Sequence, residues 1–372
     1  MLRLSLITTA IGVLAAGPAE GPNPEGTRAP LAAPDQLSQA QGSEARGSEI
    51  RRTLTAMGTR LSLSVTAAER RVALLASEDL ARAIDATEAR LSTWRGDSEV
   101  AQLNAEQRGS LSRTTAAELE SVLAIARTCE GAFDPTCGAL VEAWGLRSAS
   151  GPRRPSPAAL DAALARTGWQ QVALDGLDAT LSGGVLFEEG AWGKGAGLDR
   201  ALEALALTAA TGATIDLGGQ VAWFGRAPRT FDLSHPDRRH EVIARVDAAE
   251  QFTSVATTGN SERGTAADGK WIGHVIDPRT GEPADDFGSL TVLAGDALSA
   301  DAFSTGLYVL GPAAALALAE RIDGLEVVIA ERDGSEIAIR HSSGLDGRVR
   351  GVDPTAPLPH DPDPQLRSEI LR

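Results

Sequence analysis

Residues 213–224 have the sequence ATIDLGGQVAWF, and they open the region that decides the fold. This region is dominated by short runs typical of β-strands, rich in Val, Ile, Thr and aromatic residues. The runs lie at 213–217, 220–224, 229–233, 241–246, 252–257, 271–276 and 288–293. The pair Gly218-Gly219 interrupts the strand pattern, which indicates a bulge or a close approach of two backbones.

The flanking segments supply most of the helices. Apolar spacing predicts helices at 68–91, 115–130, 157–166, 194–207, 299–309 and 312–322. Further strands are expected at 61–65, 171–174, 179–181, 185–188, 325–330 and 335–340. Because the helices come mostly first and the strands are bunched later, the order predicts an α+β fold. In such a fold the helices pack on a largely antiparallel sheet.

Composition excludes several classes of protein. The chain has 372 residues, with 35 basic and 50 acidic side chains and a formal charge of −15. Such an acidic chain is poorly suited to nucleic acid or to anionic lipid, which both attract basic surfaces. Two cysteines exclude a disulfide scaffold and a multi-cysteine metal site.

Both ends differ in composition from the middle of the chain. An apolar run from Leu4 to Ala16 follows Arg3, which predicts a signal peptide over residues 1–19 and export to the periplasm. The run is too short to span a bilayer, so membrane association is expected only through a partner or an uncleaved N-terminus. We expect a flexible linker at 20–50, a folded domain at 51–340 and a disordered tail at 341–372.

Two glycine-rich segments carry candidate binding chemistry. In Gly131–Gly138 (GAFDPTCG), Asp134-Pro135 predicts a new helix, with Asp134 near its cap. This is either a capped turn or a turn that presents amides and a carboxylate to a polar ligand. In Glu189–Asp199 (EGAWGKGAGLD), Lys194 stands among glycines at a helix start, which suits an anionic group. The alternative is a simple tight turn.

Two later segments carry candidate catalytic chemistry. His274 is expected on a strand before the turn Asp277–Gly281, as a structural or a functional histidine. Asp301 and Thr305 are four residues apart and share one helical face. Their oxygens are the hard ligands that suit Mg²⁺ together with substrate phosphate. The alternative is a surface aspartate that bonds a neighbour.

Taken in order, these segments resemble the ApbE family, the FAD:protein FMN transferases. Met57-Gly58-Thr59, Ser92-Thr93-Trp94 and Asp97–Asn104 add to the match, which covers about 51–340. The resemblance implies an α+β architecture related to T-folds. It implies Mg²⁺-dependent cleavage of the FAD pyrophosphate, transfer of FMN to a Thr or Ser hydroxyl of an acceptor protein, and release of AMP.

The resemblance also assigns roles to residues. The Ala191 carbonyl, Asp301 and Thr305 are implied as metal ligands, and His274 as the base that deprotonates the acceptor hydroxyl. Lys194 is implied as a contact near the phosphates. The other implied FAD contacts are Met57, Trp94, Ala132, Phe133, Asp134, Val275 and Ile276.

Three residues depart from the family pattern. Trp94 and Ser261 stand where Tyr is common, and Gln220 stands where Asp is common. Cys129 and Cys137 flank the Gly131 turn, and in an oxidising compartment they either pair or remain free. Two other activities stay open at this point: hydrolysis of FAD to FMN and AMP, and FAD binding without catalysis.

Overall fold

The computed structural model describes residues 47–148, 151–260, 264–267, 270–334 and 336–352. The signal-peptide prediction, most of the linker, Ser261 and the chain after residue 352 lie outside the described residues. The folded region nevertheless exceeds the predicted limits of 51–340. Strand β1 begins at Ser48, and a short helix and strand follow residue 342 because Leu345 is buried in the core.

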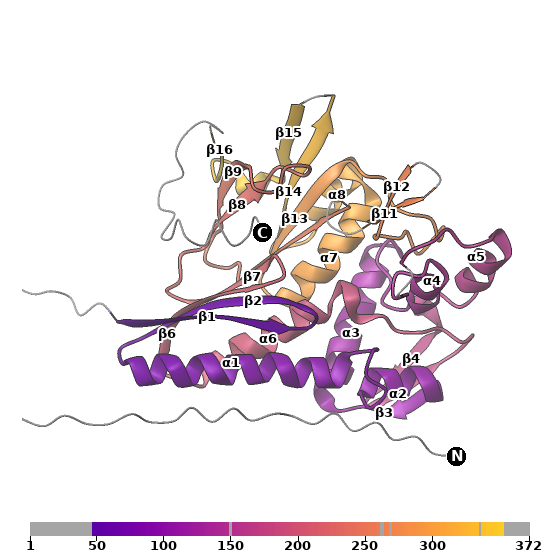
Figure 1. Cartoon of the computed structure of the whole chain (residues 1–372), viewed down its shortest axis with the longest axis horizontal. Helices are drawn as coiled ribbons and strands as arrows, with labels where there is room; N and C mark the ends of the chain where they lie inside the picture. Colours follow the sequence, from indigo (N-terminus) through magenta and orange to yellow (C-terminus); the bar gives the residue numbers. More distant parts are fainter. Residues whose placement is uncertain (1–46, 149–150, 261–263, 268–269, 335, 353–372) are drawn as a thin grey trace, which may run out of the picture. The chain divides into compact units, whose positions relative to one another are not determined.

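An eight-stranded sheet forms the centre of the fold, in the order β1-β2-β6-β7-β10-β13-β14-β15 (Figure 1). All its neighbouring strands pair antiparallel, which confirms the predicted fold class. The strands are β1 (Ser48–Ala56), β2 (Thr59–Ala67), β6 (Ala210–Leu217), β7 (Gln220–Gly225), β10 (Ser254–Gly259), β13 (Gly288–Ala294), β14 (Leu325–Asp333) and β15 (Glu336–His341).

Three smaller sheets surround it. Their orders are β3-β5-β4, β16-β9-β8 and β11-β12. The strands are β3 (Arg108–Ser110), β4 (Val172–Asp175), β5 (Asp178–Leu181), β8 (Thr230–Ser234), β9 (Val242–Asp247), β11 (Gly264–Ala267), β12 (Lys270–Gly273) and β16 (Val349–Gly351).

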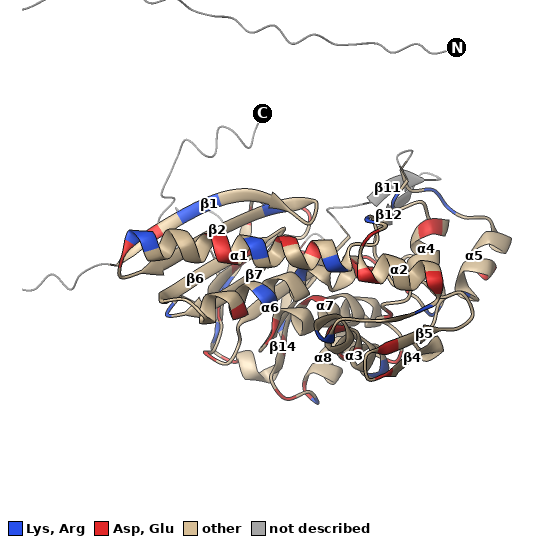
Figure 2. Ribbon diagram, turned by 90° about the horizontal axis from the view of Figure 1, so that it is seen from below, with Lys and Arg blue, Asp and Glu red and all other residues tan. Residues whose placement is uncertain are grey.

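The helices follow from apolar residues at helical spacing. Along α1 the buried positions include Ala73, Leu80 and Ile84, while several of its charged residues face solvent (Figure 2). The α-helices are α1 (Arg70–Leu91), α2 (Glu99–Glu106), α3 (Arg113–Thr128), α4 (Gly138–Ala143), α5 (Pro157–Leu164), α6 (Gly193–Ala206), α7 (Ala297–Leu310) and α8 (Pro312–Ala319). Short 3₁₀ helices are η1 (Trp169–Gln171), η2 (Glu189–Ala191) and η3 (Ser343–Leu345). None of the described helices is long and apolar enough to cross a bilayer.

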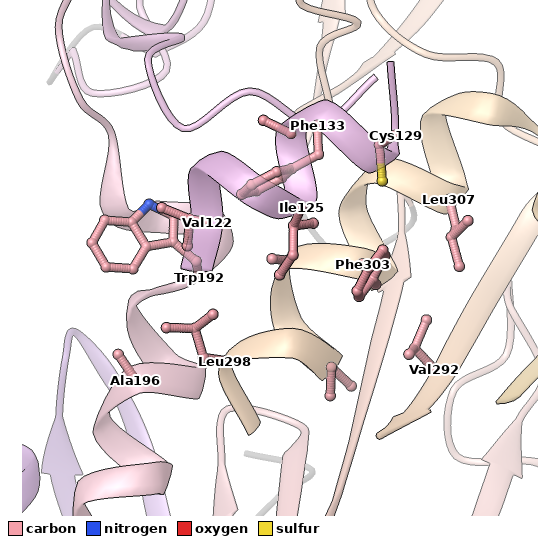
Figure 3. Packing of buried hydrophobic residues seen from close by; sticks show 14 of the residues in the cluster. Val122, Ile125, Cys129, Phe133, Trp192, Ala196, Val292, Leu298, Phe303 and Leu307 are labelled. Atoms are coloured by element: carbon pink, nitrogen blue, oxygen red, sulfur yellow. The ribbon is translucent and has the colours of Figure 1, made fainter. Parts of the chain in front are cut away.

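The middle strands of the large sheet are buried on both faces. On one face Val292 packs with α3 and α7, around Phe133, Phe303 and Leu307 (Figure 3). On the other face Leu293 belongs to a core shared with β8 and β9. All seven residues of β13 are therefore buried. This arrangement sets the helices on one side of the central strands and the small β16-β9-β8 sheet on the other.

Several local predictions were wrong. Gly218 and Gly219 both have positive φ and form the tight turn between β6 and β7, so the bulge alternative was wrong. The alternative of a close backbone approach agrees with the Gly218 amide, which donates to the Arg60 carbonyl at 2.9 Å. Residues 185–188 were predicted as a strand, but Leu186 forms only an isolated parallel bridge with Cys137. Helix α4 begins at Gly138, three residues after Pro135, and the short helix α2 was not predicted.

Candidate active site

Every residue that the sequence analysis assigned to the site lines one cavity of about 1180 Å³. The assigned residues come from the β1–β2 turn, the loop after α1, the loop after α3, the start of α6, the segment after β12 and helix α7. These segments are distant in sequence, so only the fold brings them together. The cavity is larger than the roughly 300–1,000 Å³ of ordinary small-molecule pockets.

The start of α6 and helix α7 meet beside the cavity. Lys194 Nζ lies 3.0 Å and 3.2 Å from the two carboxylate oxygens of Asp301, and the Gly195 amide donates to Asp301 Oδ2 at 3.0 Å. Asp301 is buried, whereas the Lys194 side chain is 28% exposed. A Cβ atom on Gly195 would lie 2.2 Å from the Ala297 carbonyl oxygen. Glycine at this position therefore allows the two helices to touch.

Two residues that the sequence analysis did not assign hold α7 in place. Asp199 accepts from the amides of Ala297 and Leu298 at 2.7 Å and 2.9 Å, so a side chain of α6 caps the first turn of α7. Burial raises the pKa of Asp199 to about 7, although these two amides act in the opposite direction. Gln220 Nε2 donates to the Ala297 carbonyl at 2.8 Å. The sequence did contain a hint of this role, because Asp199 is an acidic residue on the same predicted helix as Lys194, five positions further along.

The oxygen atoms near this junction suit a divalent cation. Asp301 supplies the carboxylate, Thr305 a hydroxyl and Ala191 a backbone carbonyl, and all three residues line the cavity. The first α-helical hydrogen bond of α6 runs from the Ala196 amide to the Trp192 carbonyl. The Ala191 carbonyl comes one residue earlier, just before this first turn of the helix. Within the described part of the chain, no group of three His, Cys, Asp or Glu side chains is placed to hold a metal. One carboxylate with neutral oxygens fits Mg²⁺, which keeps water and phosphate as its remaining ligands.

Met57 occupies the tip of the turn between β1 and β2. Both Met57 and Gly58 have positive φ, of 48° and 68°, which is uncommon for a non-glycine residue. The Met57 amide donates to Glu88 Oε2 at 2.8 Å, and the Met57 methyl group lies over Gly197 of α6. The turn is thus held against the cavity by a contact to α1 and a contact to α6.

A charged cluster that the sequence analysis missed also lines the cavity. Arg147 forms ion pairs with Glu188 and Glu189, and its guanidinium carbon lies 4.9 Å from the centre of the Trp94 ring. Trp94 is 67% exposed. Burial raises the pKa of Glu188, and Arg147 opposes that shift. The Arg147 guanidinium therefore covers one face of the Trp94 ring, and the opposite face is left for stacking.

Asp134 organises its own loop. Its Oδ1 accepts from the amide and hydroxyl of Thr136 at 2.8 Å and 2.6 Å, and its Oδ2 accepts from the Trp169 amide at 2.9 Å. Burial raises the pKa of Asp134 against these hydrogen bonds. Its carboxylate does not cap α4, contrary to the expectation of a helix beginning at Pro135. Asp134 still lines the cavity beside Phe133.

The His274 segment follows β12 instead of belonging to it. Strand β12 ends at Gly273, where a Cβ atom would lie 2.1 Å from the Asn260 side chain, so only glycine fits there. The Val275 amide donates to Asn260 Oδ1 at 3.3 Å. His274, Val275 and Ile276 all line the cavity. The predicted strand placement of His274 was therefore wrong, and His274 lies in the loop that follows β12.

The two cysteines are free thiols. Cys129 is completely buried against α7, near Gly306, and burial raises its pKa to about 12. Cys137 lies beside Leu186 and burial raises the pKa of its thiol as well. The open alternative of a disulfide brace at the Gly131 turn is therefore not realised. The turn is held by packing and by the Asp134 hydrogen bonds.

Comparison with known proteins identifies relatives of this chain. The model of the ApbE family matches residues 57–329. A FAD:protein FMN transferase of Treponema pallidum is 31% identical over 350 residues, covering 84% of this chain and 92% of the relative. One from Haemophilus influenzae is 29% identical, covering 72% and 82%.

Solved structures agree with the fold. The flavinyl transferase ApbE of Pseudomonas stutzeri in its apo form has a TM-score of 0.72 at 23% identity, covering 82% of this chain and 98% of that one. The ApbE protein of Thermotoga maritima has a TM-score of 0.71 at 26% identity, covering 81% and 99%.

Proposed function

Because the chain belongs to the ApbE family, we propose that it is an FAD:protein FMN transferase that moves FMN from FAD to an acceptor protein. The observation that carries this proposal is the convergence of the assigned residues, from six separate segments, on one cavity. A cavity of about 1180 Å³ also leaves room for a dinucleotide and part of an acceptor.

The chemistry is a phosphoryl-type transfer. The hydroxyl oxygen of an acceptor Thr or Ser forms a bond to the phosphorus atom on the flavin side of the pyrophosphate. The bond from that phosphorus to the bridging oxygen breaks, and AMP leaves with the bridging oxygen. The hydroxyl proton passes to a base. We assign this base to His274, because a neutral imidazole accepts protons near neutral pH and His274 lines the cavity.

Lys194 and Asp301 have complementary roles in this proposal. Asp301, Thr305 and the Ala191 carbonyl would hold Mg²⁺, which when bound stabilises negative charge on the phosphate oxygens. Lys194 adds a positive charge at the N-terminal end of α6, where backbone amides also favour an anion. The α6–α7 contact thus fixes an ammonium group and a carboxylate within 3.2 Å of each other.

The test is product analysis by mass spectrometry. The protein is incubated with FAD and Mg²⁺, with and without a candidate acceptor protein bearing an accessible Thr or Ser. We expect AMP together with an acceptor whose mass has increased by one FMN. Equal AMP release in both samples, without modified acceptor, would identify an FAD hydrolase. Tight FAD binding without AMP release would identify a binding protein.

Site residues are tested with a matched pair of variants. Asp301→Asn removes a carboxylate in the cavity, and Asp85→Asn removes an exposed carboxylate on α1. The proposal requires a large loss of AMP release in the first variant only. Equal activities would remove Asp301 from the reaction.

We also propose that the protein acts after export, in the periplasm, on an acceptor located there. The apolar run Leu4–Ala16 and its small-residue flank support this location. Expression of the full chain in a bacterium, followed by fractionation and N-terminal sequencing, tests it. A protein that remains in the cytoplasmic fraction with Met1 intact would overturn the proposal.

A further inference from the structure

Strand β8 has a free edge among the described residues. It stands at one end of the order β16-β9-β8 and pairs only with β9. The Ala248 amide donates to the Arg229 carbonyl on the β8 side, whereas the Asp247 amide donates to the Arg348 carbonyl on the β16 side. Backbone groups of an antiparallel strand alternate between its two edges.

This alternation identifies which backbone groups of β8 face away from β9. Phe231 and Leu233 are opposite Val246 and Ala244, and they use their amides and carbonyls within the ladder. Thr230 and Asp232 therefore direct their amides and carbonyls to the free edge. The register is regular up to Leu233 and shifts after it.

The active-site cavity runs along this edge. All five consecutive residues of β8, Thr230–Ser234, line it. Successive side chains of a strand point to opposite faces, so a cavity against one face would be lined by every second residue. Strand β6 shows that pattern, because it contributes Thr214 and Asp216 but not Ile215. Lining by five residues in a row indicates that the cavity reaches the edge of the strand and not one face alone.

A second strand, β10, also contributes consecutive residues to the cavity wall. Strand β10 pairs with β7 only at Ser254 and Val255, and the next four residues, Ala256–Gly259, line the cavity in succession. The cavity also contains His274 and Asp301. A polypeptide lying beside β8 would therefore occupy the same cavity as the catalytic groups.

We propose that the acceptor protein binds as an extended segment that adds a strand to the free edge of β8. The inference rests on the proposed function, which requires a Thr or Ser of a second protein to enter this cavity. Main-chain hydrogen bonds to Thr230 and Asp232 hold the segment and tolerate varied sequences. Side chains at alternate positions of the segment then contact the cavity walls and select the acceptor.

A backbone substitution tests the edge directly. Thr230→Pro removes the outward amide at the first position of an edge strand, where proline is tolerated. Thr230→Val keeps the amide and nearly the same side-chain shape. We expect the proline variant to raise KM for an acceptor peptide by about tenfold, and the valine variant by less than about twofold. FAD affinity, measured separately, reports whether the cavity is still folded.

The second part of the test varies the acceptor peptide. Peptides carrying single N-methyl groups, given to the unsubstituted enzyme, should lose transfer at alternate positions around the acceptor hydroxyl, because every second amide bonds to β8. Equal KM for the two Thr230 variants, or a loss without alternation, would overturn the inference. So would a change in oligomeric state by light scattering in Thr230→Pro alone, since a second copy would then occupy the edge. Absence of modified acceptor with the unsubstituted enzyme would instead defeat the proposed function.

Discussion

The contact between α6 and α7 depends on the absence of one methyl group. In Gly195→Ala the new Cβ would lie 2.2 Å from the Ala297 carbonyl oxygen and 2.6 Å from the Leu298 Cα. Both neighbours are backbone atoms, so the helices must separate by about 1 Å to reach ordinary contact. Such a shift stretches the 3.0 Å bond from the Gly195 amide to Asp301 beyond hydrogen-bonding range.

The energy change follows from three terms. Overpacking costs about 1–3 kcal/mol, and a weakened hydrogen bond to a charged group costs about 1.5–3 kcal/mol. Alanine in place of glycine in a helix returns about 1 kcal/mol. We therefore expect Gly195→Ala to lower the free energy of unfolding by about 1.5–5 kcal/mol and to reduce FMN transfer strongly.

The control lies two residues further along the same helix. In Gly197→Ala the Cβ would meet the flexible end of Met57, 2.8 Å away, which can turn aside. The helical gain of about 1 kcal/mol should then remain largely intact. Urea denaturation of both variants gives the comparison. Equal stabilities would refute the reasoning that backbone contact at Gly195 sets the distance between the helices.

Three further predictions concern single side chains. Asp301→Asn should lower Mg²⁺-dependent AMP release by at least about 100-fold, measured over a Mg²⁺ titration; activity within twofold contradicts the ligand role. His274→Gln should slow transfer to an acceptor by roughly 100-fold or more in single-turnover experiments, and an unchanged rate excludes it as the base. Burial raises the folded-state pKa of Asp199 to about 7, above its ordinary 3.8, so the native state binds more protons between these values. Stability should therefore fall as pH rises from about 4 to about 7, and Asp199→Asn should remove that slope in urea titrations at several pH values.

Features that depend on residues close together in the sequence could be predicted from it. The spacing of Asp301 and Thr305 placed them on one helical face, and the glycines around Lys194 indicated a helix start. The alternation around Leu63 predicted β2. These features depend on 3.6-residue and two-residue periods, which a sequence displays directly. The ApbE resemblance then connected segments that no local pattern relates.

Other features depended on contacts between distant segments. The helix expected at Pro135 begins later because Asp134 is bonded to Thr136 and to Trp169, 35 residues away. His274 lies beyond β12, which ends at Gly273 beside the Asn260 side chain. The Arg147 cluster was missed, since its partners lie both before and after it in the chain. In each case a hydrogen bond or a close contact outweighs local preference.

The amino-acid sequence indicated the class of fold and, through the ApbE resemblance, a set of candidate site residues that all line the cavity. Tertiary structure alone decided that Lys194 faces Asp301, that Asp199 caps α7 and that β8 leaves an edge beside the cavity. The physical reason is that periodicity reveals which face of an element is buried, whereas pairing between elements is set by packing across the whole core.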